Sequence, residues 1–427
     1  MKKLRLVMIG NGMAGVRTLE ELLKVAPDIY DITVFGAEPH PNYNRILLSP
    51  VLAGEQRFEE IVLNDLAWYR ERSIRLVLGC KVSQIDRIRR KVIAEDGSEA
   101  EYDRLLIAAG STPFVLPIPG NTLDGVIGYR DIADTLTMMA TARTHKHAVV
   151  IGGGLLGLEA ANGLKLRGMD VTVVHLGNWL MDRQLDTTAS QLLQQSLEQR
   201  GLKFLLSRQT AELMDNGAGR VRAVRFADGE SIPADLVVMA AGIRPNISLA
   251  EAAGLPCNRG ILVNDTLQTF DPRIYAVGEC ASHRGTAYGL VAPLFEQARV
   301  CANHLAMLGF SRYPGSVTAT RLKVTGIELF SAGDFIGGEG TEAITFCDPI
   351  GGIYKKLVIK DDVLVGACLY GDTRDSAWYF NQIRENRNVS AIRQHLMFGE
   401  EAISLPRLPR RSTRANSPSP SLAAAAR

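Results

Sequence analysis

Two glycine motifs with the same spacing are the residues of this sequence that point most clearly to chemistry. Both read G-x-G-x-x-G after a β-rich run, and their glycines are Gly10, Gly12, Gly15, Gly152, Gly154 and Gly157. In a strand–turn–helix unit, the first glycine permits a tight turn, the second lets the backbone approach a pyrophosphate, and the third lets the helix pack on the strand. The helix N-terminus then offers unpaired N–H groups to the phosphates. Each motif therefore predicts a site for the pyrophosphate of a dinucleotide.

The elements that must position these glycines are repeated as well. An amphipathic helix is expected after each motif, followed by a second β-run, "DITVF" in the first copy and "DVTVV" in the second. Each copy continues with short strands around an Asp-Gly turn, in "KVIAEDGSEAEYDRLLIAAGSTP" and "RAVRFADGESIPADLVVMAAGIRP". Asp-Gly favours the φ > 0 hairpin turn, so both segments read as a β-meander that returns to the parent sheet. We predict an α/β protein with two Rossmann-like dinucleotide-binding domains, each with three layers that include a β-meander.

Composition bounds the class of protein. The chain has 427 residues, of which 46% are hydrophobic and 22% charged, and a net charge of +2. This length predicts two or three domains, and the balanced charge gives no basic field for nucleic acid. No apolar run reaches the length of a membrane span and no signal peptide precedes the first β-run, so we expect a cytoplasmic protein without a membrane partner.

The six cysteines are scattered and form no C-x-x-C pair. This pattern argues against a zinc site, a cysteine-ligated iron–sulfur cluster and a redox-active disulfide in this chain. We therefore predict ordinary reduced thiols and no metal site.

A later segment separates the two nucleotide sites. "TLQTFDPRIYAVGECA" places a surface turn before a buried strand, and Glu279 follows that strand. The segment resembles the late flavin-binding motif of the two-dinucleotide-binding-domain flavoprotein reductases, the pyridine nucleotide-disulfide oxidoreductase-like family, which usually has G-D where this chain has Gly278-Glu279. The resemblance implies that the acid contacts the ribityl and phosphate part of FAD. It also implies that the N-terminal unit binds FAD and that the unit beginning at Val149 binds NAD(P)H.

Further motifs narrow the resemblance. They are "GNGMAG", "YNRILLS", "GGGLLGLEAA", "MDRQLD", "AGIRPN", "YAVGECA" and "YGLVAP". Together they look like the FAD-dependent N-terminal portion of the NAD(P)H-dependent assimilatory nitrite reductase large subunit, over about residues 1 to 400. The resemblance implies an FAD-binding domain at 1–113 and 247–320, an NAD(P)H-binding domain at 114–246 and a small α+β C-terminal domain at 321–400. Residues 401–427 are rich in Pro, Ser, Ala and Arg and are expected to form a disordered tail.

Hydride transfer to a flavin needs groups that position the reactants and exclude water, not a nucleophile. We predict Glu159 and Arg45 as catalytic residues: the resemblance puts Glu159 beside the nicotinamide ring, and Arg45 would add positive charge on the FAD side. The predicted cofactor-binding residues are Gly10, Gly12, Met13, Ala14, Gly15, Glu38, Arg45, Ser49, Val82, Ala109, Gly110, Gly152, Gly154, Leu155, Leu156, Gly157, Glu159, His175, Ala241, Gly242, Gly278, Glu279, Val291 and Ala292.

The sequence departs from the family pattern near two carboxylates. Gly36 and Ala37 stand where many relatives have an acid that holds the FAD adenosine ribose, so Glu38 is predicted to take that role. Related ferredoxin- and rubredoxin-type reductases often carry a lysine after "LS" that pairs with the glutamate of the second glycine helix. Pro50 follows Ser49 here, so Glu159 is predicted to lack that partner.

A third departure lies at the end of the second β-run of the NAD(P)H unit, where His175 replaces the expected carboxylate. A carboxylate there would accept from the ribose hydroxyls of NADH and repel the 2′-phosphate of NADPH. Histidine removes this repulsion without the bidentate fork of an arginine. We therefore expect relaxed discrimination and write the coenzyme as NAD(P)H.

These features predict an NAD(P)H-oxidising flavoprotein that passes electrons through FAD to a separate redox protein of the iron–sulfur, sirohaem or rubredoxin type. The resemblance favours the reductase component of nitrite or nitrate assimilation. Because the sirohaem and cysteine-rich segments of a complete large subunit are missing, the chain is not expected to reduce nitrite alone. The alternatives are a rubredoxin or ferredoxin reductase serving an oxygenase, and a non-catalytic flavin-binding interaction protein. The sequence leaves an oligomer possible.

Overall fold

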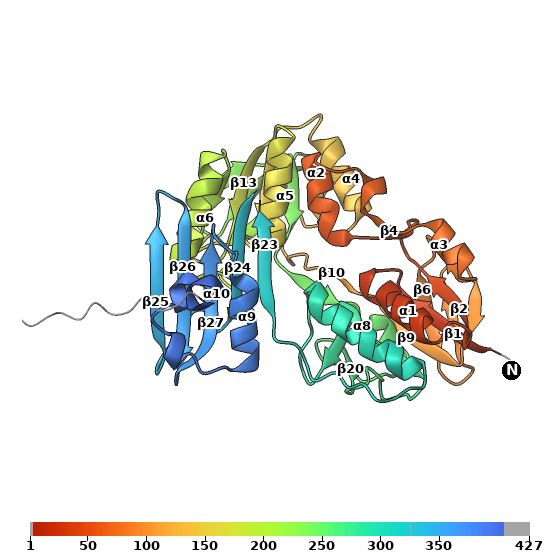
Figure 1. Ribbon diagram of the computed structural model, residues 1–427. Helices are drawn as coiled ribbons and strands as arrows, with labels where there is room; N and C mark the ends of the chain where they lie inside the picture. Colours follow the sequence, from red (N-terminus) through yellow and green to blue (C-terminus); the bar gives the residue numbers. More distant parts are fainter. Residues whose placement is uncertain (1–2, 325, 405–427) are drawn as a thin grey trace, which may run out of the picture.

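A parallel five-stranded sheet forms around the first glycine motif. The computed structural model describes residues 3–324 and 326–404 (Figure 1). The strand order is β21-β9-β1-β2-β5, and every neighbouring pair is parallel. The strands are β1 (Leu4–Ile9), β2 (Tyr30–Phe35), β5 (Arg75–Val77), β9 (Arg104–Ile107) and β21 (Ile274–Ala276). Their aliphatic residues are buried because both faces of the sheet are covered.

One face of this sheet carries helices and the other a β-meander. Helices α1 (Met13–Val25) and α8 (Val291–Leu305) pack with Leu6, Met8 and Val34 in one core cluster. The meander packs on the opposite face, and its strands are β6 (Val82–Asp86), β7 (Lys91–Ala94) and β8 (Glu99–Glu101). Gly97 has φ +83° in the turn between β7 and β8, as the Asp-Gly signal predicts.

The second unit repeats this plan. Its parallel sheet has the order β11-β18-β12-β13-β14. Its elements are β11 (Val126–Gly128), α4 (Ile132–Thr141), β12 (His147–Ile151), α5 (Leu155–Leu166), β13 (Asp170–Val174), α6 (Thr187–Gln199), β14 (Lys203–Leu205) and β18 (Leu236–Met239), with a meander of β15 (Thr210–Asp215), β16 (Val221–Phe226) and β17 (Ser231–Pro233). Gly229 has φ +89° in the second Asp-Gly turn. The predicted fold class is confirmed.

Two antiparallel strands, β10 (Ser111–Pro113) and β19 (Ile243–Pro245), pair where the chain enters and leaves the second unit. The remaining short elements are β3 (Asn42–Tyr43), α2 (Leu48–Ala53), β4 (Val62–Asn64), α3 (Leu66–Glu71), α7 (Ser248–Ala252), β20 (Ile261–Val263) and β22 (Ala281–His283). No helix within residues 3–324 and 326–404 combines the length and apolar character that a membrane span requires.

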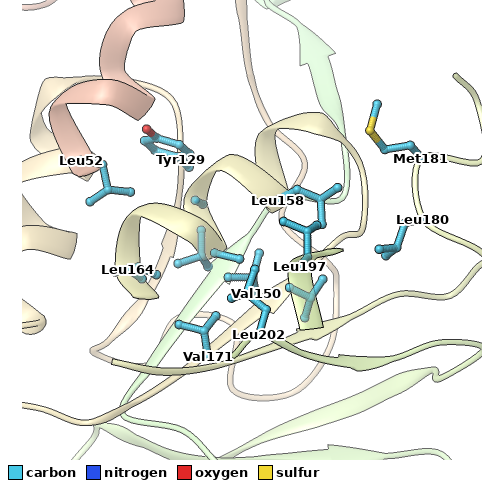
Figure 2. Close-up of a cluster of buried hydrophobic side chains, with 14 of the residues drawn as sticks. Leu52, Tyr129, Val150, Leu158, Leu164, Val171, Leu180, Met181, Leu197 and Leu202 are labelled. Atoms are coloured by element: carbon cyan, nitrogen blue, oxygen red, sulfur yellow. The ribbon is translucent and has the colours of Figure 1, made fainter. Parts of the chain in front are cut away.

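Helix α2 belongs to the N-terminal part of the chain but packs against α4 and α5 of the second unit (Figure 1). Leu52 and Tyr129 lie near each other at one edge of a buried cluster (Figure 2). A Cβ on Gly163 would lie 2.7 Å from the Leu52 Cγ, so the glycine makes room for this contact. Arg167 donates to the Leu52 carbonyl and, at 3.1 Å, to the Val51 carbonyl. The α2–α5 contact therefore braces the two nucleotide units against each other.

The C-terminal region forms an antiparallel sheet with the order β23-β24-β27-β26-β25. Its elements are β23 (Ala319–Val324), β24 (Ile327–Gly333), β25 (Glu342–Asp348), β26 (Ile353–Lys360), β27 (Val363–Tyr370), α9 (Ser376–Glu385) and α10 (Glu400–Ser404). Residues 401–404, which we predicted as the start of a disordered tail, lie in α10 because the chain turns back toward α9, with Glu400 N–H donating to Asp375 Oδ1. The rest of the predicted tail lies outside the described residues.

A buried carboxylate joins the C-terminal sheet to the second unit. Asp186 is 7% exposed, and its Oδ1 caps α6 by accepting from the Ala189 N–H at 3.0 Å. Its Oδ2 accepts from the Tyr354 hydroxyl at 2.7 Å and lies 3.4 Å from the Lys356 Nζ. Tyr354 and Tyr370 of this sheet share one hydrophobic core with Leu193 and Leu197 of α6. The C-terminal sheet and the second unit are therefore one packed body.

Candidate functional site

The three glycines of the first motif have different local roles. Gly10 has φ +99°, and a Cβ there would lie 2.2 Å from the Ala108 carbonyl oxygen. A Cβ on Gly15 would lie 2.9 Å from the Ala108 Cβ, so this glycine allows α1 to approach the sheet. A Cβ on Gly12 would meet no described atom within 4 Å. Gly12 is therefore not required by internal packing, and the space beside it at the start of α1 is open for phosphate oxygens.

The second motif repeats this geometry. Gly152 has φ +128°, and its Cβ would lie 2.3 Å from the Ala240 carbonyl oxygen. A Cβ on Gly157 would lie 2.0 Å from the Gly152 carbonyl oxygen. A Cβ on Gly154 would have no neighbour within 4 Å in the part of the chain that the structure describes. Both loops thus leave an open space at the second glycine, where a pyrophosphate would approach the backbone.

A cavity of about 460 Å³ connects the first loop with the second unit. Its volume falls within the range of small-molecule sites. The predicted residues that line it are Gly10, Gly12, Met13, Ala14, Glu38, Arg45, Ala109, Gly110, Leu155, Leu156, Glu159, Gly278, Glu279 and Val291. Leu155, Leu156 and Glu159 come from α5, so the helix of the second glycine motif forms one wall of the cavity of the first.

Glu38 was predicted to hold the FAD adenosine ribose and Arg45 to add positive charge on the FAD side, and the two side chains contact each other. Arg45 Nη2 donates to Glu38 Oε1 at 2.5 Å, and the Tyr43 hydroxyl donates to Glu38 Oε2 at 2.7 Å. Arg45 Nη1 also donates to the Arg130 carbonyl at 2.6 Å. The Arg45 charge is therefore balanced by Glu38, and both side chains are held in place at the cavity wall.

Glu279 is held by two residues that the sequence did not single out. Arg130 forms an ion pair with it, and the Ser111 hydroxyl donates to Glu279 Oε2 at 2.7 Å. Arg130 and Ser111 also line the cavity. Ser111 lies in the quoted "AAGSTP" segment, whereas Arg130 stands in no motif, and only the fold brings it to Glu279.

Glu159 lacks the lysine partner of related reductases, as expected, but it has another. The Ser49 hydroxyl donates to Glu159 Oε2 at 2.7 Å, and the Tyr129 hydroxyl donates to Ser49 Oγ at 3.2 Å. Burial raises the pKa of Glu159 to about 7, and the Ser49 hydrogen bond opposes that rise. Ser49 was predicted to bind the cofactor, and it lies behind the cavity wall as the partner of Glu159.

His175 directly follows β13, and its ring turns back onto the second glycine loop. The Gly153 N–H donates to His175 Nδ1 at 3.2 Å, and Nε2 lies 3.8 Å from Asp182 Oδ2. A neutral ring that accepts at Nδ1 carries its proton on Nε2, toward Asp182. His175 therefore binds the loop amide through Nδ1, whereas its buried Nε2 has no hydrogen-bond partner within the described residues.

The other predicted residues lie around these loops. Gly15 lies in α1 on the face that packs against the sheet, and Val82 is buried in β6 with the core of the first meander. Ala241 and Gly242 are exposed between β18 and β19, and Ala292 is exposed in the first turn of α8. The start of α8 at Val291 reaches the cavity wall, where the helix dipole favours negative charge.

Two open glycine loops, each at the start of a helix on its own parallel sheet, define a protein with two dinucleotide-binding domains. The model of the pyridine nucleotide-disulphide oxidoreductase family matches residues 4–304, and that of the rubredoxin NAD+ reductase C-terminal domain matches residues 319–387. The chain belongs to the pyridine nucleotide-disulphide oxidoreductase family, whose members use FAD and NAD(P)H.

Three proteins illustrate the similarity. The NAD(P)H nitrite reductase of Bacillus subtilis is 54% identical over 91% of this chain and 48% of its own length. The assimilatory nitrate reductase electron transfer subunit of the same organism is 48% identical over 93% of this chain and 51% of its own length. The chain thus spans about half the length of these relatives. A ferredoxin reductase from Rhodopseudomonas palustris, 26% identical, superposes with a TM-score of 0.80 over 88% of this chain and 93% of its own.

Proposed function

We propose that this chain is an NAD(P)H-dependent flavoprotein reductase that binds FAD in the cavity beside Gly12 and NAD(P)H at the loop of Gly154. The observation that carries the proposal is the pair of open glycine loops together with a cavity that α5 of the second unit helps to line. This arrangement supports a meeting of the two cofactors at one junction.

The cavity residues fit FAD. The open space at Gly12 suits the pyrophosphate, and the start of α8 suits the negative charge of a flavin. Glu38 and Glu279 are acceptors for ribose and ribityl hydroxyls, and each is already oriented by an arginine. FAD, when bound, would supply the redox chemistry: it can accept an electron pair from a nicotinamide and pass the electrons to an acceptor. The chain's own residues position the cofactors and exclude water.

We propose a separate redox protein as the electron acceptor, in nitrite or nitrate assimilation. The names of the two Bacillus subtilis relatives support this assignment, and both are about twice as long as the matched region. The same proposal includes the domain boundaries given above, the use of NAD(P)H as coenzyme, and a cytoplasmic location. The free cysteines suit a reducing compartment.

A second candidate is a rubredoxin or ferredoxin reductase that serves an oxygenase. It is favoured by the match to the rubredoxin reductase C-terminal domain and by the similarity to a ferredoxin reductase. The two candidates share the flavin chemistry and differ only in the acceptor.

The test is to purify the protein, record its flavin spectrum, and titrate NADH and NADPH with ferricyanide as acceptor. We expect bound FAD, its reduction by NAD(P)H, and turnover with ferricyanide. A flavin-free protein, or a flavin that NAD(P)H does not reduce, would contradict the proposal. Comparing a sirohaem protein with a rubredoxin and a ferredoxin as acceptors separates the two candidates.

A further inference from the structure

Glu159 lies where the two nucleotide units meet. It belongs to α5, the helix of the second glycine loop, yet it lines the cavity of the first loop. Its hydrogen-bond partner Ser49 comes from α2, an N-terminal helix that packs on α5 (Figure 1). The carboxyl group therefore lies at the junction through which the two cofactors would meet.

Two hydroxyl groups stand in line behind this carboxyl. Tyr129 is 1% exposed, and its hydroxyl donates to Ser49 Oγ, which in turn donates to Glu159 Oε2. Tyr129 packs beside Leu52 in the hydrophobic cluster, which fixes the ring (Figure 2). Because each hydroxyl donates toward the carboxyl, the line stabilises its ionised form against the penalty of burial.

The charged neighbours do not neutralise Glu159. Within the described residues Glu159 forms no ion pair. The titratable or charged residues that share its cavity are Glu38, His40, Tyr43, Arg45, Tyr129, Arg130, Asp131 and Glu279. Arg45 is paired with Glu38, Arg130 is paired with Glu279, and Asp131 caps α4. The proton affinity of Glu159 is therefore set by burial and by the Ser49 hydroxyl.

We propose that the Tyr129–Ser49–Glu159 line is a proton-binding device, in which Glu159 takes up a proton when electrons enter the cavity and releases it when they leave. The inference rests on the proposed function. For each electron pair that enters the cavity, the ionised fraction of Glu159 takes up protons from solvent, to a limit of one proton per carboxylate, in addition to any proton that bound FAD would take up with the electrons. No bond other than the carboxyl O–H forms on the protein, and Ser49 and Tyr129 act as positioning residues.

The physical reason is charge. Electrons that enter a low-dielectric cavity add negative charge beside a carboxylate, and a like charge at short range raises its proton affinity. Burial already holds the pKa of Glu159 at about 7, so a further rise makes the fraction of Glu159 that is still ionised bind a proton at physiological pH. An ordinary surface glutamate would stay ionised in both states.

The test is the dependence of the flavin midpoint potential on pH in the FAD-loaded protein. Each proton bound with the electron pair adds one equal increment to the slope, by linkage. In a pH window that begins near 7 and ends at the pKa of Glu159 in the reduced protein, we expect the wild-type slope to exceed that of Glu159→Gln, with twice the Gln slope as the upper limit. Glu159→Gln keeps the Ser49 hydrogen bond but binds no proton. Equal slopes in the two proteins overturn the inference.

A series at the hydroxyls tests the positioning roles. Ser49→Ala removes the donor to the Glu159 carboxylate and so raises the pKa of Glu159 further. The steep part of the plot of midpoint potential against pH should therefore begin at higher pH. Tyr129→Phe should shift it in the same direction by less, and Ser49→Thr should restore the wild-type onset. If the steep part of the plot begins at the same pH in Ser49→Ala as in the wild type, Ser49 and Tyr129 do not position the Glu159 carboxylate.

An infrared titration of the Glu159 carboxyl group needs no bound flavin, so it also tests the inference if a variant loses its FAD. The carbonyl band that disappears in Glu159→Gln should titrate near pH 7 in the wild type before any coenzyme is added. A Glu159 that is fully ionised well below that pH contradicts the inference. A protein that binds no FAD at all contradicts the proposed function instead, so the two failures are distinct.

Discussion

The two glycine loops have the same backbone and different strand ends. In both, the first glycine lies at positive φ against a small-residue carbonyl, and the second faces open space. After β2 the strand end delivers Glu38 into a network with Arg45 and Tyr43 at the cavity wall. After β13 it delivers His175, which binds the amide of Gly153. The backbone geometry of the glycine loop is therefore duplicated, whereas the side chain at the strand end differs between the two units.

The largest expected effect follows from changing the first loop. Gly12→Val should give a folded protein without FAD, because the new side chain meets no described atom and occupies the space for the phosphates. The measurement is the ratio of flavin absorbance to protein. Gly338→Val is the matched control, since that glycine also has open space around it and lies in the C-terminal domain. A fully flavinated Gly12→Val protein would reverse the assignment of this loop.

The same substitution in the second loop should separate the two sites. Gly154→Val should retain FAD and lose reduction by NAD(P)H, while dithionite still bleaches the flavin. Rapid-mixing absorbance with each reductant measures both properties. If FAD is lost and nicotinamide binding survives, the loops have been assigned in reverse.

A smaller effect, on the stability of the folded protein, is expected from Glu159, which belongs to α5 and lines the cavity of the first loop. The folded protein holds a proton on Glu159 up to about pH 7, whereas the unfolded chain releases it near 4.5, the ordinary pKa of a glutamate. Wild-type stability should therefore fall as pH rises through this window, by at most about 3 kcal/mol, relative to Glu159→Gln. Thermal unfolding of both proteins between these pH values measures the difference. Parallel stability curves would show that Glu159 ionises normally.

The smallest effect concerns the second strand end. His175→Glu should lower the NADPH:NADH ratio of kcat/KM several-fold, mainly through KM, because a carboxylate beside the 2′-phosphate costs about 1 kcal/mol. His175→Gln adds no charge and should leave the ratio near that of the wild type. An unchanged ratio in His175→Glu would mean that this position does not face the ribose and serves only the Gly153 amide.

The sequence was sufficient for the parts of the fold that depend on local backbone chemistry. The glycines at positive φ, the Asp-Gly turns and the runs of buried aliphatic residues each carry a local signal, so the two sheets and their meanders were predicted. The position of Gly278 and Glu279 just after a buried strand was predicted because that strand has a local signal. These features need no knowledge of what lies across the cavity.

The sequence was insufficient where partners come from distant segments. Arg130 and Glu279 are brought together only when the two units pack, and no spacing in the sequence encodes their pairing. The Ser49–Glu159 hydrogen bond likewise depends on α2 crossing to α5. The sequence shows that no lysine follows Ser49, but it does not show that the hydroxyl groups of Ser49 and Tyr129 form hydrogen bonds in line with Glu159 instead.

The buried contact of Asp186 with Tyr354 and Lys356 bears on how such a chain can evolve. A gene rearrangement that separated the C-terminal sheet from the second unit would leave a buried carboxylate without its partners and expose the core face of α6. Such a break is therefore expected to destabilise both parts. The NAD(P)H nitrite reductase of Bacillus subtilis is similar over 91% of this chain, and this match spans both sides of the joint.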